Sequence, residues 1–199
     1  MGIASFLSLW GRLKRLPRTG WLIGGVDRAA AESIADHVSR TVLITSILCD
    51  QINSGREYSV DSEKALKMAL LHDLPEVYIS DMGKEATRYV GVEVKRRAEE
   101  KAVKDLLAML PANLKEGYSD LLTEFRNQES IESRLVRVAD KLEAVLQASE
   151  YGRAGYHHGM TEGMLKELKG AAKVCDNQHV NDLIGDVMES FDLTAVGGE

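Results

Sequence analysis

Cysteine and proline are scarce in this sequence. Its 199 residues include two cysteines and three prolines, and aromatic residues make up 6%. Cys49 and Cys175 are too few for a disulfide framework and have no partners at metal-binding spacing, so we expect a reduced, cytoplasmic protein. Because alanine, leucine, glutamate and lysine are plentiful instead, the composition favours helices over strands.

Long apolar runs and an excess of basic residues are also missing. Near the N-terminus, Arg12, Lys14 and Arg15 interrupt the apolar stretches, so we expect neither a signal peptide nor a membrane span. Lysine and arginine number 25 against 31 acidic residues, which gives a net charge of −6. An acidic surface repels a polyphosphate backbone, which argues against a nucleic-acid polymer as partner and leaves a single nucleotide open.

The sequence does contain the material for one helical core. Hydrophobic residues make up 44% and charged residues 28% of the chain, which are ordinary values for a globular protein. No segment alternates between polar and apolar residues as a half-buried strand would. We therefore expect an all-α fold, with residues 1–199 forming a single helical bundle domain. Its motifs lie within about 18–150, and its C-terminal helices cover about 160–190.

Helical periodicity and capping residues divide the chain into segments. Residues 17–26 contain three glycines and are expected to form a loop, whereas the tail 194–199 is expected to fray. Pro75 lacks an N–H and clashes with a preceding helical turn, so it predicts a break. The expected helices cover about 4–16, 30–53, 61–71, 92–109, 117–127, 130–150, 160–174 and 177–190.

The first chemical signal is the adjacent pair His72 and Asp73 in the segment ALLHDLPE. Neighbouring helical residues point about 100° apart, so the pair suits a hydrocarbon core poorly but is able to bracket one ion from two directions. Imidazole nitrogen and carboxylate oxygen are suitable ligands for zinc, manganese, cobalt or iron. The break at Pro75 frees the backbone to turn both side chains toward a common point.

Two residues on other predicted helices fit the same ligand set. His37 shares a helical face with apolar neighbours, and Asp140 lies mid-helix between apolar residues. A buried carboxylate is costly unless it is paired or metal-bound, and a bundle core is a natural place for a metal. Taken alone, His37 also suits a hydrogen-bonded core histidine, and Asp140 is equally able to pair with Arg137, Lys141 or Lys104. The joint arrangement on separate helices favours the metal site.

The order of these residues resembles the H…HD…D motif of the HD-domain phosphohydrolases. Four segments narrow the resemblance to the 5′-deoxynucleotidase branch of that family: RTGW at 18–21, ESIADH at 32–37, HDLPEVYISD at 72–81 and VADKLEA at 138–144. The similarity spans roughly residues 5–150 and leaves the C-terminal third without a recognised motif.

The resemblance implies an all-helical enzyme, usually a homodimer, that hydrolyses deoxyribonucleoside 5′-monophosphates to deoxynucleoside and phosphate. It also implies a divalent metal, with cobalt and manganese as the usual activating ions. The metal ligands it implies are His37, His72, Asp73 and Asp140.

The resemblance further assigns residues to catalysis and substrate binding. Glu76 and Asp73 are the expected catalytic residues, with Glu76 handling the attacking water, and Asp81 is expected to line the pocket. Arg18 is expected to contact the phosphate, for which its planar fork of donors is suited, and Trp21 the sugar. Other interpretations stay open at this point: Trp21 also suits packing, Glu76 a solvated helix position and Asp81 a helix N-cap.

Three competing functions remain open from the sequence. An HD hydrolase acting on a nucleoside triphosphate or an alarmone would need more cationic side chains than the sequence visibly clusters. A metal-bound nucleotide sensor without turnover would need neither Glu76 nor Arg18, and both are present. A purely structural scaffold would not place four polar ligands toward its interior.

Two further charged or histidine-rich segments have simpler explanations. The run KRRAEEKAVK at 95–104 mixes charge signs at helical spacing, which is typical of a solvated face. Arg96 or Arg97 is nevertheless able to reach the site from that helix. The adjacent pair His157 and His158 is expected to lie in an exposed loop.

Overall fold

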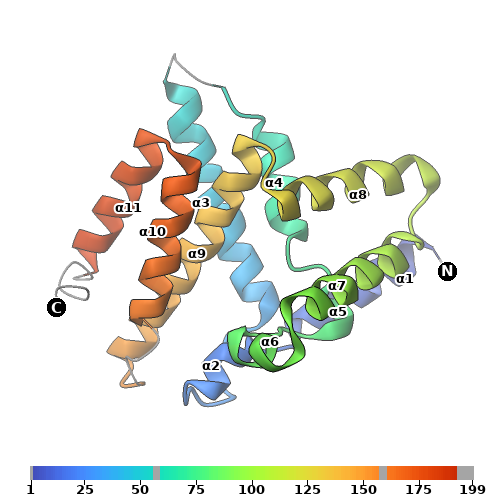
Figure 1. Ribbon diagram of the computed structural model, residues 1–199, viewed down its shortest axis with the longest axis horizontal. Helices are drawn as coiled ribbons and strands as arrows, with labels where there is room; N and C mark the ends of the chain where they lie inside the picture. Colours follow the sequence, from blue (N-terminus) through green and yellow to red (C-terminus); the bar gives the residue numbers. More distant parts are fainter. Residues whose placement is uncertain (1, 56–58, 157–160, 192–199) are drawn as a thin grey trace.

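The computed structural model describes residues 2–55, 59–156 and 161–191, and the regular structure in those ranges is helical (Figure 1). The one β-type pairing there is an isolated bridge between Pro17 and Ser33. The prediction of an all-α fold is therefore confirmed. The helices are α1 (Ile3–Trp10), the 3₁₀ helix η1 (Gly11–Lys14), α2 (Thr19–Ile23), α3 (Ile34–Ser54), α4 (Ser62–Leu71), α5 (Glu76–Ile79), α6 (Lys84–Val90), α7 (Val92–Leu107), α8 (Ala112–Asn127), α9 (Ile131–Arg153), α10 (Thr161–Cys175) and α11 (Gln178–Ser190).

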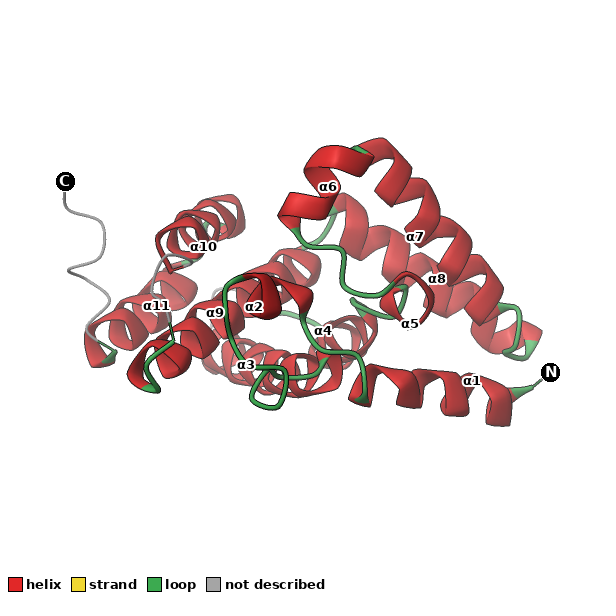
Figure 2. Cartoon of the chain, turned by 90° about the horizontal axis from the view of Figure 1, so that it is seen from below, coloured by secondary structure: helices red, strands yellow, loops and turns green. Residues whose placement is uncertain are grey.

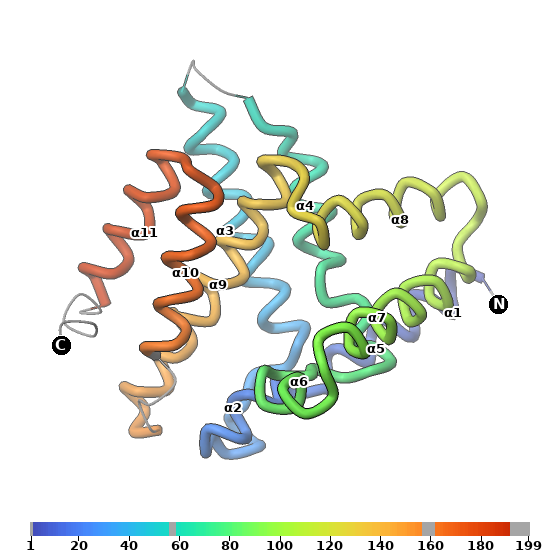
Figure 3. Tube along the Cα trace, in the orientation of Figure 1, coloured from blue at the N-terminus to red at the C-terminus, as the bar shows by residue number. Residues whose placement is uncertain are grey.

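Helices α3 and α9 form the centre of the arrangement. Helix α9 packs against α3, α4, α8 and α10. In Figures 1 and 3, α10 and α11 lie at one end of the molecule, whereas α1, α7 and α8 extend toward the other. Helix α5 lies between α7 and the α1–η1 segment (Figure 2). No helix among the described residues is both long and apolar enough to span a bilayer.

Local capping explains where the two central helices begin. At the start of α3 the Ser33 side chain accepts from the Asp36 backbone N–H, and Asp36 accepts from Ser33 in return. Ser130 and Ser133 form the same reciprocal pair at the start of α9. Each arrangement satisfies backbone donors that a helix end leaves without partners. The two caps, Ser33 and Ser130, lie close to residues 30 and 130, where these helices were predicted to start.

The core consists of two main apolar clusters that meet along α3. One is built mainly from α3, α4, α9, α10 and α11 and includes Leu48, Ile52, Met68, Leu135, Leu142, Leu168 and Ile184. The other joins α1, η1, α5, α7 and α8 and includes Phe6, Leu13, Ile34, Leu74, Val77, Leu106 and Leu122. His37 lies on α3 between Ile34 of the second cluster and Ile44 of the first. His37, the predicted metal ligand on α3, therefore lies at the boundary between the two clusters.

Several predicted boundaries differ from the observed ones. The expected first helix is divided into α1 and η1, and α2 lies inside the expected loop 17–26. Helix α8 starts directly after Pro111, whose fixed φ suits a helix start, rather than near residue 117. The short helix α6 was not predicted, and Gly91 at φ +92° turns the chain from it into α7.

The segment after α4 has the break that Pro75 predicts. Helix α4 ends at Leu71, four residues form a turn, and α5 begins after Pro75. Ser80 follows α5 with a φ of +60°, which reverses the chain direction before Asp81. Two predictions, the exposed loop at His157 and His158 and the frayed tail 194–199, lie outside the described residues.

Candidate metal centre

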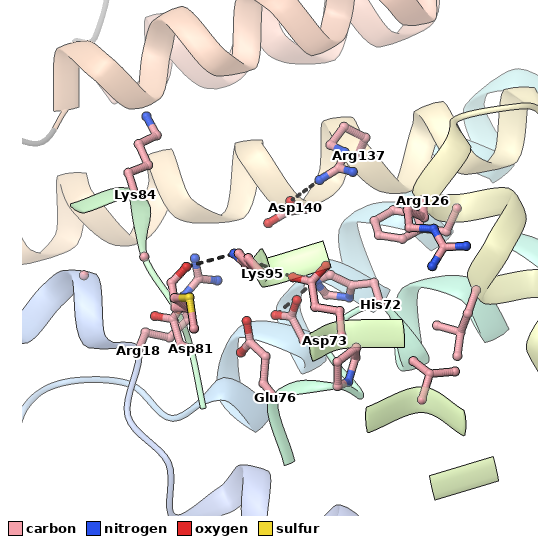
Figure 4. A pocket seen from close by; sticks show the side chains of 18 of the residues that line it. Arg18, His72, Asp73, Glu76, Asp81, Lys84, Lys95, Arg126, Arg137 and Asp140 are labelled. Carbon is pink, nitrogen blue, oxygen red and sulfur yellow. Dashed lines mark hydrogen bonds and ion pairs between the residues drawn. The ribbon is translucent and has the colours of Figure 1, made fainter. Parts of the chain in front are cut away.

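Three separate parts of the fold bring the four predicted ligands together, and Figure 4 shows three of them, His72, Asp73 and Asp140. His37 comes from the first turn of α3, His72 and Asp73 from the turn after α4, and Asp140 from the middle of α9. His37 Nε2 lies 3.3 Å from Asp140 Oδ1 and 3.6 Å from Asp73 Oδ2. His72 Nε2 lies 3.3 Å from Asp73 Oδ2 and 3.3 Å from His37 Nε2. The donor atoms of His37, His72 and Asp140 lie within 4.8 Å of one another.

The outer nitrogens of both histidines are already committed to acceptors. His72 Nδ1 lies 2.7 Å from the Ala69 carbonyl oxygen, and His37 Nδ1 contacts Glu143 Oε2. When these Nδ1 atoms donate, both Nε2 atoms present lone pairs to each other. Two lone pairs at this distance repel unless a positive charge lies between them. The donor set of two imidazoles and two carboxylates therefore fits a divalent transition-metal ion.

Without a metal ion, a proton takes part of that role. Burial and the Arg18 charge lower the pKa of His37, but hydrogen bonds to Asp140 and Glu143 raise it to about 9 overall. His37 is then protonated at neutral pH in the metal-free protein. A cation entering the site displaces this proton, so metal binding competes with protonation.

The two aspartates stay ionised despite their burial. Burial alone would raise the pKa of Asp140, but Lys141 and the two histidines hold it well below its usual value. In the same way burial alone would raise the pKa of Asp73, but His72, His37 and Arg18 lower it by more, so that it lies below its usual value. Metal ligation requires carboxylates rather than carboxylic acids, and both groups meet that requirement at neutral pH.

Asp140 also has the charged neighbours that the sequence left open. Lys141 Nζ lies 3.0 Å from Asp140 Oδ2, and Arg137 Nη1 lies 3.8 Å from the same oxygen. The oxygen that faces His37 is the other one, Oδ1. The two interpretations of Asp140 are therefore compatible, because each uses a different carboxylate oxygen.

Glu143 is part of this centre and was not singled out from the sequence. It is fully buried, contacts His37, and accepts from Arg40 Nε at 3.0 Å. Arg40 is held in turn by Glu150 on the outer side of α9, at 2.7 Å. Its spacing in the sequence could have indicated this role, because Glu143 follows Asp140 by three residues and so shares its face of α9.

Arg18 stands at the edge of the site without an ion-pair partner among the described residues. Burial alone would lower the pKa of its guanidinium, but Asp73, Asp140 and Asp81 raise it overall, so Arg18 keeps its charge. Its backbone N–H donates to the Glu32 carbonyl oxygen at 3.0 Å. A charged guanidinium with uncommitted donors beside a metal centre is suited to binding a phosphate.

Asp81 anchors the turn that carries Arg18. Its Oδ2 accepts from the Thr19 backbone N–H at 2.7 Å, and its backbone oxygen accepts from the Thr19 hydroxyl at 2.7 Å. Asp81 therefore caps the start of α2 from a distant part of the chain. The alternative, a cap on the following helix, is not observed, because Gly83 occupies the N-cap of α6.

Glu76 presents an uncommitted carboxylate oxygen beside the centre. Its Oε2 is buried and has no hydrogen-bond partner among the described residues. Burial, together with the charges of Asp73 and Asp81, raises the pKa of Glu76 well above its usual value. A carboxylate oxygen without a partner beside the predicted ligands is placed to accept a proton, and a raised pKa makes the carboxylate a stronger base.

Trp21 lies mostly inside the protein. Its side chain is 1% exposed, its indole N–H donates to Glu32 Oε1 at 2.7 Å, and its ring meets that of Tyr151 edge to face. It also contributes to the wall of the cavity beside Arg18. Packing therefore accounts for most of the ring, and contact with a sugar would involve only the part that lines the cavity.

One cavity of about 840 Å³ is lined by three of the four predicted ligands, His72, Asp73 and Asp140, and by Arg18, Trp21, Glu76 and Asp81, whereas His37 lies outside its lining. Its volume falls within the range of roughly 300 to 1,000 Å³ that small-molecule sites occupy. Five lysines from four helices line it, namely Lys84, Lys95, Lys104, Lys115 and Lys141, and no sequence pattern groups them. Arg96 and Arg97 do not line it and pair instead with Glu93 on the outer face of α7, as a solvated face requires.

Proteins of known family match most of the chain. The sequence model of the HD domain matches residues 10–179. The 5′-deoxynucleotidase HDDC2 of Homo sapiens is 34% identical over 149 residues, which cover 75% of this chain and 68% of that protein. The 5′-deoxynucleotidase hdd1 of Schizosaccharomyces pombe is 32% identical over 193 residues, which cover 95% of this chain and 90% of that protein.

Solved structures match the fold over nearly its whole length. A conserved hypothetical protein from Pyrococcus furiosus has a TM-score of 0.75 and 34% identity, with 94% of this chain and 99% of that chain covered. An HD-domain phosphohydrolase from Listeria innocua has a TM-score of 0.72 at 16% identity, with 98% and 91% covered. At that lower identity the likeness concerns the fold alone.

Proposed function

The chain belongs to the HD-domain family, and from this membership we propose that it is a metal-dependent 5′-deoxynucleotidase. It hydrolyses deoxyribonucleoside 5′-monophosphates to deoxynucleoside and phosphate. The observation that carries the proposal is the meeting of His37, His72, Asp73 and Asp140 beside the partnerless carboxylate of Glu76. The 5′-deoxynucleotidase relatives support the reaction and the substrate class.

His37, His72, Asp73 and Asp140 would hold the metal, for which we propose cobalt, manganese or a similar ion. When bound, a divalent cation supplies Lewis acidity that polarises the phosphate and lowers the pKa of a water molecule. Glu143 and the Ala69 carbonyl keep both histidines in the tautomer that ligation needs.

The protein's own groups position the substrate and move the proton. Arg18 donates to the phosphate oxygens and opposes their charge as it shifts during the reaction. Glu76 accepts a proton from water while the water oxygen forms its bond to phosphorus. The bond between phosphorus and the 5′ oxygen then breaks, and that oxygen leaves as a hydroxyl after taking up the proton that Glu76 accepted from water.

We assign Trp21 and Asp81 to the nucleoside end of the cavity. Both line it next to Arg18, which supports contact with, or placement of, the sugar. We also propose that the protein acts as one domain and as a homodimer. The motif resemblance supports the dimer, and the family match across residues 10–179 supports the single domain.

A second candidate function is hydrolysis of a nucleoside triphosphate or an alarmone. The observation that favours it is that five lysines, Lys84, Lys95, Lys104, Lys115 and Lys141, line the cavity. Their charge is partly neutralised, because Glu167 pairs with Lys84 and lies 3.7 Å from Lys141 Nζ. The monophosphate reaction therefore remains the better-supported proposal.

Phosphate release from a substrate panel tests the proposal. The panel contains deoxy- and ribonucleoside mono- and triphosphates, each with cobalt, manganese or magnesium. We expect deoxynucleoside monophosphates to release phosphate with cobalt or manganese. Activity on triphosphates alone would favour the second candidate, and no release at all from metal-loaded protein would leave the sensor alternative.

Glu76→Gln tests the role of the carboxylate. The amide keeps the shape but cannot accept the proton, so we expect kcat to fall by roughly 10²- to 10⁴-fold with metal content unchanged. Metal analysis and steady-state kinetics measure both quantities. Glu116→Gln, at an exposed position of α8 outside the cavity, is the control and should behave as the native protein. A Glu76→Gln protein with native kcat would remove Glu76 from the mechanism.

A further inference from the structure

Lys95 lines the cavity and carries a positive charge, but neither the proposed metal ligation nor the phosphate contact of Arg18 involves it. It lies on α7, and its side chain is 27% exposed. Figure 4 shows it extending from α7 into the cavity, between the side of Arg18 and Asp81 and the side of His72 and Asp73. Its position inside the cavity distinguishes it from the outward arginines that follow it on the same helix.

The ammonium group is held in place but is only weakly neutralised. Lys95 Nζ donates to the Met82 carbonyl oxygen at 2.8 Å. Among the described residues its one ion-pair partner is Glu99, with a carboxylate oxygen 3.7 Å away. An ammonium has three donors, and a neutral carbonyl takes one of them without cancelling the charge. A held cation with donors to spare remains directed toward the cavity.

Lys95 and Arg18 act on the same neighbour from different elements. Burial, Asp73 and Asp81 raise the pKa of Glu76, and Arg18 and Lys95 are the two cations that oppose them. Both positive charges therefore lie within electrostatic reach of the carboxylate beside the candidate metal ligands. An anion that entered this part of the cavity would be attracted by both cations at once.

The charge of the proposed substrate matches this pair. The two aspartate ligands balance a divalent cation, and a phosphate monoester carries nearly two negative charges at neutral pH. Arg18 supplies one positive charge toward that dianion, and a second cation nearby would add to the attraction. Of the five cavity lysines, Lys84 and Lys141 contact Glu167. Among the described residues, Lys95 is the one that is both oriented by a hydrogen bond, to the Met82 carbonyl, and close enough to Glu76 to oppose the rise of its pKa.

We propose that Lys95 Nζ is a second phosphate-binding group, which contacts the phosphate of the substrate together with Arg18. This inference rests on the proposed function, because it places a phosphate monoester beside the metal ligands. Lys95 then fixes the phosphate from the α7 side while Arg18 holds it from the start of α2.

The test is titration of the manganese-loaded protein with inorganic phosphate, the proposed product. We expect Lys95→Met to weaken phosphate binding by roughly 10- to 100-fold, since it removes a charged hydrogen bond. Lys95→Arg keeps the charge and should bind within a few-fold of the native protein. Lys101→Met removes the same charge from an exposed position of α7 outside the cavity and should leave binding unchanged.

A purely structural Lys95, which only secures the Met82 carbonyl, gives a different result. In that case Lys95→Met would lower the thermal midpoint and leave the phosphate affinity of the folded fraction at the native value, which overturns the inference. If Lys95→Met does not fold, Lys95→Gln keeps an amide donor and removes the charge. Native phosphate affinity in folded Lys95→Gln, or an equal loss in Lys101→Met, also overturns it.

Kinetics separate this inference from the proposed function. If deoxynucleotides are hydrolysed and Lys95→Met keeps the native KM and phosphate affinity, Lys95 is not a phosphate ligand while the function stands. If no nucleotide is hydrolysed but phosphate binding depends on Lys95, the function fails while the anion site stands. When both hold, KM rises in Lys95→Met and is restored in Lys95→Arg.

Discussion

Single residues outside the ligand set determine how the candidate centre is oriented. Glu143 holds His37 through Nδ1, and Arg40 holds Glu143. Burial would raise the pKa of Glu143, but His37, Arg18 and Arg40 keep it below its usual value. The glutamate is therefore an anion, and it strengthens His37 as a donor toward the centre.

We predict that Glu143→Gln weakens metal binding by about 10- to 100-fold, the usual effect of losing such a partner. The neutral amide no longer strengthens His37, although all four ligands remain. Competition with a chelator of known affinity measures the change. Glu150→Gln is the matched control, because Glu150 pairs with the same Arg40 but lies at the surface and does not touch His37. An equal loss in both variants would trace the effect to Arg40 instead.

Single residues of the site could be predicted from the sequence only where their polarity differed from that of their neighbours. His37 and Asp140 were recognisable because polar residues on an apolar helical face are conspicuous. Lys95 was not, because a lysine in a run of mixed charges is typical of a solvated face. Its direction into the cavity depends on where α7 packs, and periodicity contains no information on that placement.

At the scale of elements, the start of α2 depends on a contact with a distant segment. Its five residues contain a glycine and follow Arg18, and so short a helix has little stability of its own. Asp81 supplies the missing cap through Thr19, and the packing of Trp21 holds the other side. The sequence predicted a loop here because both stabilising contacts are tertiary.

We predict that Asp81→Ala raises KM for the nucleotide by a factor on the order of 10, since a lost helix cap costs about 1 kcal/mol and frees Arg18 to move. Metal affinity should remain native, because Asp81 is not among the predicted ligands. Thr19→Val keeps the backbone N–H that donates to Asp81 and removes only the hydroxyl, so a smaller rise is expected. Steady-state kinetics at saturating metal provide the comparison, and an unchanged KM in Asp81→Ala would contradict this role.

At the scale of the whole molecule, an ion-pair cluster whose members do not line the cavity joins three helices. Lys64 of α4 contacts Glu132 at the start of α9 and Glu124 of α8, each at 2.9 Å. Glu132 also accepts from the Asp61 backbone N–H at 2.9 Å. Burial raises the pKa of Glu132, but the Asp61 and Lys64 hydrogen bonds lower it below 4.5 overall.

We predict that Glu132→Gln lowers the free energy of unfolding by about 1–3 kcal/mol at pH 7, as expected for a hydrogen-bonded buried charge. The pKa of Glu132 is depressed in the folded state. Its contribution is therefore complete above the unfolded value near 4.5 and is lost as the pH falls through the folded one. Urea unfolding at pH 7 and at pH 3.5 should show a smaller difference between native and variant at pH 3.5 than at pH 7.

Glu162→Gln is the control, since Glu162 also lies in the first turn of a helix but is exposed. Its stability should stay close to native at both pH values. A stability difference for Glu132→Gln that persists undiminished at pH 3.5 would mean that packing, not charge, is responsible.

The fold class could be predicted because composition and periodicity are properties of the chain itself. The meeting of α3 with α9 could be inferred only through the ligand set, because shared ligation requires those helices to approach. The cavity could not be foreseen. Its wall combines α2, the turns before and after α5, and helices α5 to α10, and only tertiary packing brings those segments together.

Ser80, next to the candidate centre, has a backbone conformation that is unfavourable for a serine. Its φ of +60° is a conformation that glycine adopts freely, and a serine held there costs on the order of 1–3 kcal/mol. That conformation turns the chain so that Asp81 meets Thr19. At this one position the serine lowers the stability of the fold but keeps Asp81 in contact with Thr19. Selection for stability alone would give little reason to keep serine there.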